Sequence, residues 1–468
     1  MRWHVAAAVL AAIAVRLFFV WQFPATAGDT PIYDQLARNW LDHGVYGMWI
    51  EGVLTPVDLR APGYPAFLAL VYSLFGRSFL AVMHAQVAVD VLSCLLTALL
   101  AARIAPHDQR RRVFAAALWL AALCPFVANY AAVPLTEVLA TFLTTLALFL
   151  LVNFYLWFVH SGDEAVRLES PQGPIVLHAN WFWMLAGVVV GFGTLVRPEM
   201  PLLLASFALV LVFRWRAPAN WRRLAATGLS LAAGLLLALA PWAARNWRAL
   251  HEVQFLAPRY AQLPGELVPY GFNAWTKTWL ISFQDVYDVP WKLEEEAIRI
   301  EDIPDSAFDS AEERARVAAL LDQHNATLQM TPQMDAAFAD LARERRARHP
   351  VRVWVCIPLA RVFTLWLTPR IELLPFSGNV WPLRQKWQED RTDLLVTLLF
   401  GVLNLAALAL GAAGLWRARR RPGVAILVSF IALRTLFLTQ LETVEPRYVV
   451  VSIPALLALA AQRWSEPS

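Results

Sequence analysis

The stretch "PATAGDTPIYDQLARNWLDHGVYG", residues 24–47, carries three aspartates and follows at once on an apolar run. That run, residues 4–23, is long enough to cross a bilayer, which takes about 20 residues. A chain that places carboxylates directly where it leaves the membrane needs a physical reason to do so. The stretch therefore bears on both the fold class and the search for a functional site.

Turn and capping residues predict a helix within this stretch. Pro31 suits the first helical position, with Asp29 or Thr30 before it as the cap. Gly44 suits the end of the helix. One face of this helix is apolar at helical spacing, so we expect it to lie flat on the outer membrane surface. The residues on this face are Ile32, Tyr33, Leu36, Ala37, Trp40 and Leu41.

The three aspartates differ in position. Asp34 and Asp42 fall on the polar face, and we expect both to face water. Asp29 lies in the joint between the spanning helix and the surface helix, at the depth of lipid headgroups. Its carboxylate can cap the helix, or it can act as a general base where a lipid headgroup arrives.

The composition predicts an all-α integral membrane protein. The chain is 58% hydrophobic and 16% charged, too little charge to cover a soluble protein of 468 residues. The net charge of +4 does not indicate nucleic-acid binding, because much of the arginine lies in short loops, as the positive-inside rule explains. The apolar runs predict about ten to twelve spanning helices. Ten of these are expected near residues 4–23, 80–102, 113–131, 133–159, 181–197, 199–213, 223–244, 393–416, 423–440 and 447–462.

Three arginine clusters orient the helices. With the N-terminus inside, all three clusters fall in the cytoplasm, and the loop 24–79 with its surface helices faces outward. The first helix is expected to stay in the protein rather than to be removed as a signal peptide, because Arg16 interrupts its apolar region. The clusters are Arg103 with Arg110, Arg111 and Arg112; Arg214, Arg216, Arg222 and Arg223; and Arg417, Arg419, Arg420 and Arg421.

We expect three parts along the chain. Residues 1–245 form an N-terminal membrane module, 246–350 an α-rich extracytoplasmic insertion, and 351–468 the C-terminal membrane helices. Ser310 and Thr331 are predicted to cap two helices of the insertion. A complete crossing by 351–368 would put the arginines after it outside, so this segment is expected to be interfacial, re-entrant or one of a pair.

Motifs follow one another along nearly the whole chain. "GDTPIYDQLARNWLDHGVYG" (28–47) precedes "RAPGYPAFLALVYSLFG" (60–76). Together these motifs resemble the GT-C glycosyltransferases, polytopic enzymes that include the protein O-mannosyltransferases and the aminoarabinose transferase of lipid A. The resemblance leaves out about 160–180 and 270–330. The later motifs are "PLTEVLATFL" (134–143), "GTLVRPEMPLLL" (193–204), "PWAARNW" (241–247) and "EPRYVVVSIPALLALAA" (445–461).

The resemblance implies a GT-C fold and an enzyme that moves a hexosyl or pentosyl group from a polyprenyl-phosphate carrier to a lipid, protein or glycan. Transfer would occur on the extracytoplasmic face of a bacterial inner membrane, with inversion at the anomeric carbon and Asp29 as general base. Arginines would hold the leaving phosphate, since a guanidinium stays charged and grips oxygens in a fork. The expected substrate-binding residues are Arg60, Tyr64, Glu137, Arg197, Arg245, Arg447 and Tyr448.

Structural roles stay open for each of these residues. The arginines can anchor the interface or pair with a nearby acid, Glu137 can cap a helix, and tyrosine is common at membrane interfaces. Thr30 stands where the family often has a second acidic residue, so no metal ligands are assigned, although a divalent metal remains open. The three scattered cysteines predict no disulfide framework.

Two other functions remain open from the sequence. One is a polysaccharide polymerase or O-antigen ligase, which would not need the Gly-Asp joint after the first helix. The other is a transporter of lipid-linked glycans, in which broken helices or charged residues at mid-membrane are expected. Apart from the cytoplasmic clusters, the charged outliers of this chain gather at the outer helix ends instead, with Arg361 and Arg434 as exceptions.

Overall fold

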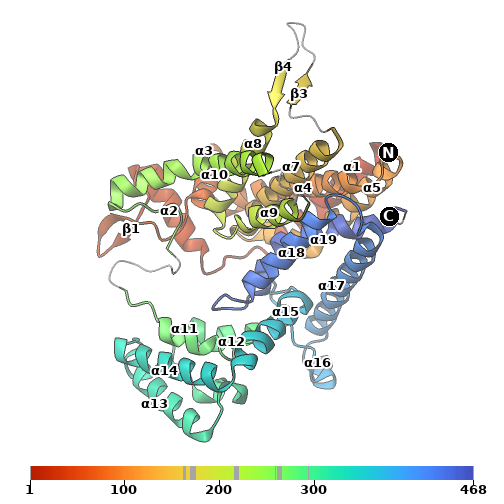
Figure 1. Cartoon of the computed structure of the whole chain (residues 1–468). Coiled ribbons are helices and arrows are strands. Elements are labelled where there is room, and N and C mark those ends of the chain that lie inside the picture. The colour runs from red at the N-terminus through yellow and green to blue at the C-terminus, as the bar shows by residue number, and fades with distance from the viewer. Residues whose placement is uncertain are drawn as a thin grey trace. The chain divides into compact units, whose positions relative to one another are not determined.

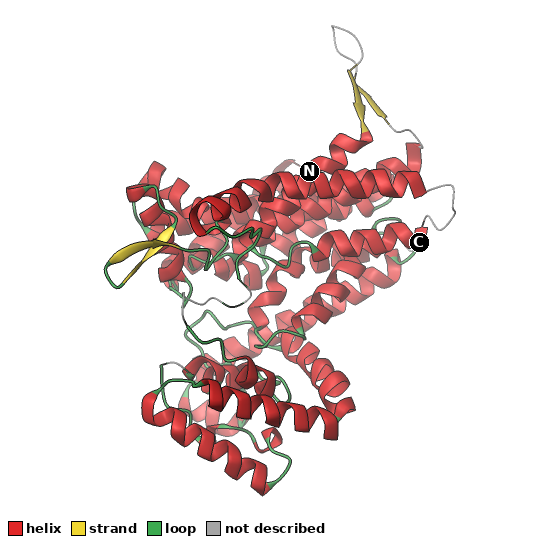
Figure 2. Cartoon of the chain, turned by 60° about the vertical axis from the view of Figure 1, so that its left-hand side comes forward, coloured by secondary structure: helices red, strands yellow, loops and turns green. Residues whose placement is uncertain are grey.

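The computed structural model describes residues 2–161, 165–168, 175–214, 221–258, 260, 266–293 and 295–466. These residues are mostly helical, and the strands among them form two short antiparallel pairs (Figure 2). The chain divides into two compact units. Unit 1 comprises residues 1–261, 369–433 and 450–468, and unit 2 comprises residues 262–368 and 434–449.

Unit 1 contains a bundle of apolar helices, in which α1, α4, α5 and α7 lie side by side (Figure 1). Every apolar run expected to span contains helix. The bundle elements are α1 (Arg2–Gln22), α4 (Phe79–Ile104), α5 (Arg110–Ala122), α6 (Pro125–Ala128), α7 (Glu137–Ser161), α8 (Ala179–Val196), α9 (Leu202–Arg214), α10 (Trp221–Leu250), α17 (Arg391–Ala418), α18 (Val424–Leu438, which ends in unit 2) and α19 (Ile453–Ala460).

By length and composition, α1, α4, α7, α10 and α17 can each cross a membrane among the described residues. Two bent helix pairs raise that number from five to at most seven, and α3 (Gly63–Phe75), α8, α9 and α18 are shorter apolar helices. The predicted class, an all-α integral membrane protein, is confirmed. The count of ten to twelve spans stays a prediction, because several of the expected spans are short helices.

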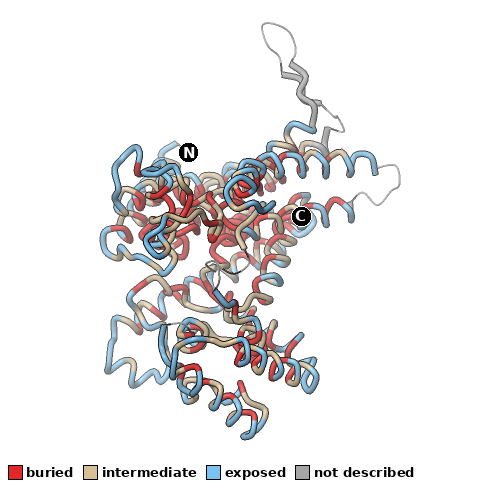
Figure 3. Tube along the Cα trace, turned by 90° about the vertical axis from the view of Figure 1, so that its left-hand side faces the viewer, coloured by how far each residue is buried: buried red, intermediate tan, exposed pale blue. Residues whose placement is uncertain are grey.

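The outer faces of the long helices support the membrane assignment. Buried residues gather inside the bundle, and its outward turns are exposed (Figure 3). Those exposed turns are apolar: Leu229 and Leu237 of α10 are 71% and 62% exposed, and Leu395 and Leu399 of α17 are 53% and 55% exposed. Helices that are apolar both inside and outside a bundle require surrounding lipid.

An ion pair lies in the interior of the bundle. Arg16 of α1 donates from Nε to Asp90 Oδ2 of α4 at 2.8 Å, and both side chains are 0% exposed. The other nitrogens of Arg16 donate to the carbonyls of Ala121 and Ala122, at the break where α5 ends and the chain bends by 51° toward α6. The pair therefore binds α1 to α4 and satisfies carbonyls that the bend leaves without helical partners.

The loop after α1 forms the predicted surface helix, α2 (Thr30–His43). Gly44 ends it in the left-handed conformation, with φ of 68°, as predicted. Tyr33, Leu36 and Ala37 of the predicted apolar face are buried. A hairpin of β1 (Gly47–Ile50) and β2 (Val53–Pro56) follows, and the sequence analysis missed it.

The polar face of α2 differs from the prediction. Asp34 does not simply face water: it pairs with Arg38 and accepts a hydrogen bond from the Tyr72 hydroxyl at 2.6 Å. Asp42 pairs with Arg77 beyond the end of α3. Asp42 is exposed, as predicted, whereas Asp34 is only 17% exposed. The prediction was therefore wrong for Asp34 alone, because it took no account of the neighbouring helix α3.

Unit 2 is built from short helices around a core of aromatic side chains. Phe272, Trp275 and Phe338 pack with ring centroids 5.1 to 5.8 Å apart. The helices that lie wholly in unit 2 are α11 (Tyr270–Thr276), α12 (Phe283–Asp288), α13 (Ala311–Thr327), α14 (Pro332–Arg348) and α15 (Ile357–Leu367).

The predicted caps in unit 2 are confirmed. Ser310 accepts from the Glu313 amide at the start of α13, and Thr331 accepts from the Met334 amide at the start of α14. The Glu313 carboxylate makes its shortest contact with buried Arg345, at 2.7 Å. It therefore ties α13 to α14 as well as supporting the helix start.

Segment 351–368 belongs to unit 2, and α14 and the helix after it meet at a bend of 99°. Arg361 in this segment is fully buried and donates to the carbonyls of Leu280, Thr439 and Leu441. Arg434 donates to the Tyr448 carbonyl at 2.9 Å. Both arginines that the sequence left without a place thus bind main-chain carbonyls within unit 2.

A candidate active site at the start of α2

Asp29 occupies the joint between α1 and α2 but does not cap α2. Its backbone is already helical, with φ of −77° and ψ of −18°, and its side chain makes no capping hydrogen bond. The neighbouring Thr30 hydroxyl is buried, where it accepts from the Ala27 amide and donates to the Pro134 carbonyl, each at 3.1 Å. The structural role weighed for Asp29 in the sequence is therefore not the one seen.

Arg60 pairs with Asp29. Its Nη2 lies 2.7 Å from Asp29 Oδ1, and the side chains of the arginine and the aspartate are 23% and 28% exposed. Burial lowers the pKa of Arg60 and the nearby Asp29 carboxylate raises it, with a net shift upward, so the guanidinium stays charged. The Tyr46 hydroxyl donates to the Arg60 carbonyl at 2.7 Å and holds the loop in place.

A second pair forms at the start of α7. Arg197 Nη2 lies 2.5 Å from Glu137 Oε1, and Arg197 also donates to the Thr136 hydroxyl and to Glu199. Glu137 is 1% exposed, and its Oε2 accepts no hydrogen bond from any described residue. A buried carboxylate oxygen without a donor is rare in a folded protein and marks a place for a ligand hydroxyl or water.

Two tyrosines lie with these pairs. The ring of Tyr33 packs edge-to-face on Tyr64, with centroids 5.1 Å apart, and Tyr64 donates to Gln86 Oε1 at 2.8 Å. Burial raises the pKa of Tyr33 above its usual range, and the carboxylates of both ion pairs raise it further while both arginines lower it. Both ion pairs therefore share one neighbourhood around Tyr33.

A close backbone approach brings two of the sequence motifs together. A Cβ added at Gly63 would lie 2.6 Å from the Leu195 carbonyl, so α3 begins directly against the end of α8. Gly63 follows Arg60 by three residues, and Leu195 precedes Arg197 by two. The glycine thus lets the two arginines approach one another from distant parts of the chain.

Arg245 contacts the chain on both sides of the β1–β2 hairpin. It donates to the main-chain carbonyls of Val57 and Tyr46, and its guanidinium lies over the rings of Tyr46 and Trp242, 5.3 and 5.1 Å from their centroids. The neighbouring Asp58 accepts from Gln254, and burial raises the pKa of this half-buried carboxyl. Arg245 therefore holds the hairpin loop on α10.

Arg447 and Tyr448 form a cluster of their own in unit 2. Glu445 is almost fully buried, and it accepts from Arg447 Nε and from the Tyr448 hydroxyl, each at 2.5 Å.

The predicted site residues thus fall into two groups. Asp29, Arg60, Tyr64, Glu137, Arg197 and Arg245 belong to unit 1, and Arg447 and Tyr448 belong to unit 2.

Sequence reasoning gave no site role to Gln86 and Thr136, which hold Tyr64 and Arg197 in place. Gln86 carried a usable signal, because a polar side chain inside an apolar spanning run is expensive unless it has a partner. Thr136 carried none beyond its place before Glu137. Among the described residues, no group of three or more His, Cys, Asp or Glu side chains is placed to hold a metal ion.

Solved structures show a likeness over nearly the whole chain. The Archaeoglobus fulgidus oligosaccharyltransferase tethered with an acceptor peptide containing the NVT sequon matches 99% of this chain and 49% of its own, at 15% identity and a TM-score of 0.50. The oligosaccharyltransferase AglB from the same organism, in complex with an inhibitory peptide and a dolichol-phosphate, matches 98% of this chain and 50% of its own, at 14% identity and a TM-score of 0.49.

The chain has the GT-C fold. It spans about half the length of the oligosaccharyltransferase that it matches, and at this identity the likeness shows the fold alone. ArnT from Cupriavidus metallidurans bound to undecaprenyl phosphate matches 98% of this chain and 78% of its own, at 14% identity and a TM-score of 0.38. No protein-family model and no curated protein matches the sequence.

Proposed function

We propose that this protein is a membrane glycosyltransferase that moves a sugar from a polyprenyl-phosphate donor to an acceptor hydroxyl or amide on the extracytoplasmic face, with inversion. The observation that carries the proposal is the environment of Asp29. Its carboxylate is not used to cap α2, it is partly exposed, and it pairs with Arg60 in the neighbourhood of the Glu137–Arg197 pair. An aspartate that served only to start α2 would cap the helix and would not need to pair with an arginine.

In the proposed reaction the acceptor attacks the anomeric carbon as the bond from that carbon to the phosphate oxygen breaks. Asp29 accepts the proton of the acceptor, and the donor leaves as polyprenyl phosphate. Charge builds up on the sugar ring and on the leaving phosphate, so a carboxylate base and fixed cations lower the barrier together. Attack from the face opposite the phosphate inverts the anomeric centre.

Arg60 connects the base to the phosphate in this proposal. An arginine has five N–H donors, and Arg60 uses donors on Asp29, on the Leu59 carbonyl and on the Tyr33 hydroxyl, which leaves others for a ligand. The same side chain can therefore orient Asp29 and bind a phosphate oxygen. Arg197 binds the sugar phosphate from the second pair, and Glu137 Oε2 accepts a hydrogen bond from a substrate hydroxyl. Arg245 supports the loop, and Tyr64 supports Tyr33.

Arg447 and Tyr448 of unit 2 are proposed as further substrate-binding residues. Both contact Glu445, which keeps the guanidinium and the hydroxyl together in one short segment. The acceptor, whether lipid, protein or glycan, is proposed to be recognised by the polar insertion, residues 246–350, most of which belongs to unit 2. The proposed location is a bacterial inner membrane.

The test is sugar transfer in membranes that contain the wild type, Asp29→Asn or Asp34→Asn. A panel of radiolabelled polyprenyl-phosphate hexoses and pentoses serves as donor. Asp29→Asn keeps the shape and removes the base, so transfer should fall by about 10²- to 10⁴-fold, while binding of the donor is retained. Asp34→Asn is the matched control on the same helix, and it should keep most of the activity.

Three other outcomes would contradict parts of the proposal. Equal transfer by wild type and Asp29→Asn would rule out Asp29 as the base and move the search to Glu137. Elongation of the donor glycan itself would favour a polymerase or ligase. Absence of transfer by the wild type across the whole panel, with movement of the intact donor between the leaflets of proteoliposomes, would favour the transporter.

A further inference from the structure

A cavity of about 690 Å³ lies in unit 1 where α4 ends. Three arginines line it: Arg103 from the last turn of α4, Arg110 from the start of α5 and Arg421 from the turn after α17. The rest of the wall is mostly apolar and includes Ile104, Leu156 and Trp157. Two of the predicted arginine clusters thus meet at one cavity.

The length of α4 separates this cavity from the Asp29 site. Val82, near the start of α4, packs in the same core cluster as Tyr33 and Tyr64. Arg103 follows Val82 by 21 residues of continuous helix, which corresponds to about 30 Å. That distance equals the thickness of the hydrocarbon core, so the cavity lies at the opposite membrane boundary.

In the part of the chain that the structure describes, the arginines of this cavity have no acidic side-chain partner. No aspartate or glutamate is among the described residues that line it. The Nε atoms of Arg103 and Arg110 are buried and donate no hydrogen bond to any described residue. Arg421 donates to uncharged oxygens of Gln462, Ser465 and Glu466, and burial lowers its pKa. Partly buried cations with no counter-charge among the described lining residues predict an anionic ligand.

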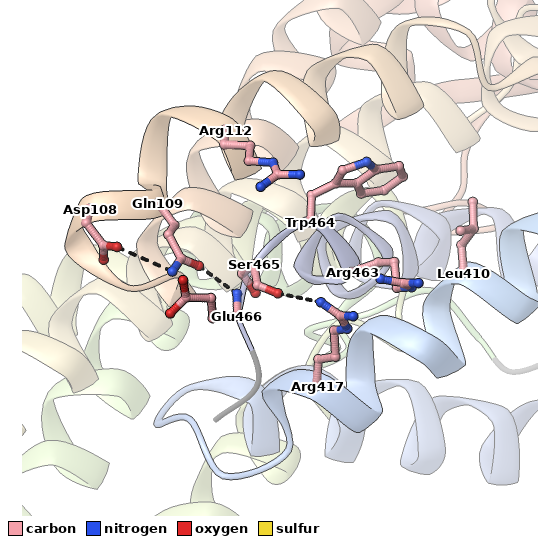
Figure 4. Close-up of a pocket in the computed structure, with 9 residues that line it drawn as sticks. All are labelled: Asp108, Gln109, Arg112, Leu410, Arg417, Arg463, Trp464, Ser465 and Glu466. Carbon is pink, nitrogen blue, oxygen red and sulfur yellow. Dashed lines mark hydrogen bonds between the residues drawn. The ribbon is translucent and has the colours of Figure 1, made fainter.

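A neighbouring cavity of about 600 Å³ offers an internal comparison (Figure 4). It is lined by Arg112, Arg417 and Arg463, but also by the carboxylates of Asp108 and Glu466. In that cavity, acidic side chains already balance part of the positive charge. The cavity at Arg103 has the same number of arginines and none of this compensation among its described lining.

We propose that the Arg103–Arg110–Arg421 cavity binds the phosphate of an anionic membrane phospholipid, with an acyl chain against its apolar wall. Guanidinium groups bind phosphate oxygens in fork geometry, and basic pockets between membrane helices select anionic headgroups. The apolar wall and the place at the membrane boundary favour a lipid over a free anion. The bound lipid joins α4, α5 and the turn after α17 on the side away from the Asp29 site.

The experiment measures retained lipid by native mass spectrometry of the full-length protein in detergent. The protein is offered phosphatidylglycerol or phosphatidylcholine, and thermal unfolding is followed in parallel. Wild type should retain phosphatidylglycerol and be stabilised by it, whereas phosphatidylcholine should have little effect. Arg103→Gln/Arg110→Gln should lower the retention of phosphatidylglycerol by about tenfold or more, because each substitution removes a hydrogen bond to a charged group.

Arg112→Gln/Arg463→Gln is the matched control from the neighbouring cavity, and it should retain the lipid as the wild type does. Arg103→Lys/Arg110→Lys keeps the charge, so partial retention is expected even if the glutamine variant folds poorly. Equal retention by all variants, or equal binding of phosphatidylcholine, would overturn the proposal. So would stabilisation by inorganic phosphate alone that the lipid does not match, since the ligand would then be a free anion.

Discussion

Arg16 and Asp90 form an ion pair inside the helix bundle, whereas Asp29 and Arg60 form one at the joint before α2. The inner pair is 0% exposed, and Arg16 contacts three helical carbonyls as well as its acid. The outer pair is about one quarter exposed. The same two chemical groups therefore hold helices together in one place and remain partly exposed in the other.

The difference shows that the role of a charged residue in a membrane protein can be assigned only when its surroundings are known. An interior arginine must have its donors satisfied by protein, because lipid supplies no partner. A pair at the interface has water and headgroups nearby, so it can open without a large penalty. Burial and the use of the donors, rather than residue type, separate the two cases.

Breaking the inner pair should have the largest effect on stability. Arg16→Gln leaves Asp90 charged and buried, so we expect a loss of about 3–5 kcal/mol in the free energy of unfolding. Asp29→Asn should cost only about 1 kcal/mol or less, as expected for a partly exposed pair. Unfolding in detergent, followed by tryptophan fluorescence, compares the two variants.

The double variant Arg16→Met/Asp90→Leu serves as the control, because it removes both charges together. It should be more stable than either single variant. If Arg16→Gln and Asp29→Asn destabilised the protein equally, the distinction between the two pairs would fail.

Gly63→Ala tests the close approach that brings the outer pair toward Arg197. The added Cβ would meet the Leu195 carbonyl at 2.6 Å, and main chain on both sides limits the relief. We expect a loss of about 1–3 kcal/mol in stability and a parallel loss of transfer. Gly28→Ala is the matched control, since no atom lies within 4 Å of its added Cβ, and it should behave as the wild type does.

Arg60→Lys sharpens the comparison by keeping the charge and removing the fork. An ammonium group can pair with Asp29 but cannot bind aspartate and phosphate in two directions at once. Transfer should fall by about tenfold, which corresponds to about 1.4 kcal/mol, with little change in unfolding temperature. Initial rates at varied donor concentration test this, and unaltered rates would remove Arg60 from phosphate binding.

Asp58→Asn is expected to have the smallest effect. Asp58 is a third kind of carboxylate, because its side-chain partner is the neutral amide of Gln254. Burial raises the pKa of Asp58 in the folded protein, so the folded state holds its proton more tightly than the unfolded state does. Stability contributed by this group is thus present at low pH and is lost as the pH rises from about 3.9 through the folded pKa.

Asp58→Asn should therefore be slightly more stable than wild type at neutral pH, with a smaller difference at pH values below the ordinary aspartate pKa. Unfolding temperatures of the two proteins across this pH range provide the measurement. A difference that grows toward low pH would show that burial does not dominate at Asp58.

Local signals carried much of the prediction. The two-residue turn Glu51-Gly52 between β1 and β2, with φ of 49° and 82°, shows what such signals still missed. Both values are positive, as in the turn that favours tight hairpins, and the Gly at the second position was a readable sign of it. The role of Asp34 was misjudged for a different reason, since its partner Tyr72 lies on α3.

The sequence by itself determined the membrane class, the places of the main apolar helices, both ends of α2 and the starts of α13 and α14, because apolar runs and caps act over a few neighbouring residues. It also determined the order of the GT-C motifs. Only the tertiary structure decided that Asp29 meets Arg60, that Glu137 meets Arg197 and that Arg16 meets Asp90. These partners are 31, 60 and 74 residues apart, and their contact depends on how helices pack in three dimensions, which no local pattern encodes.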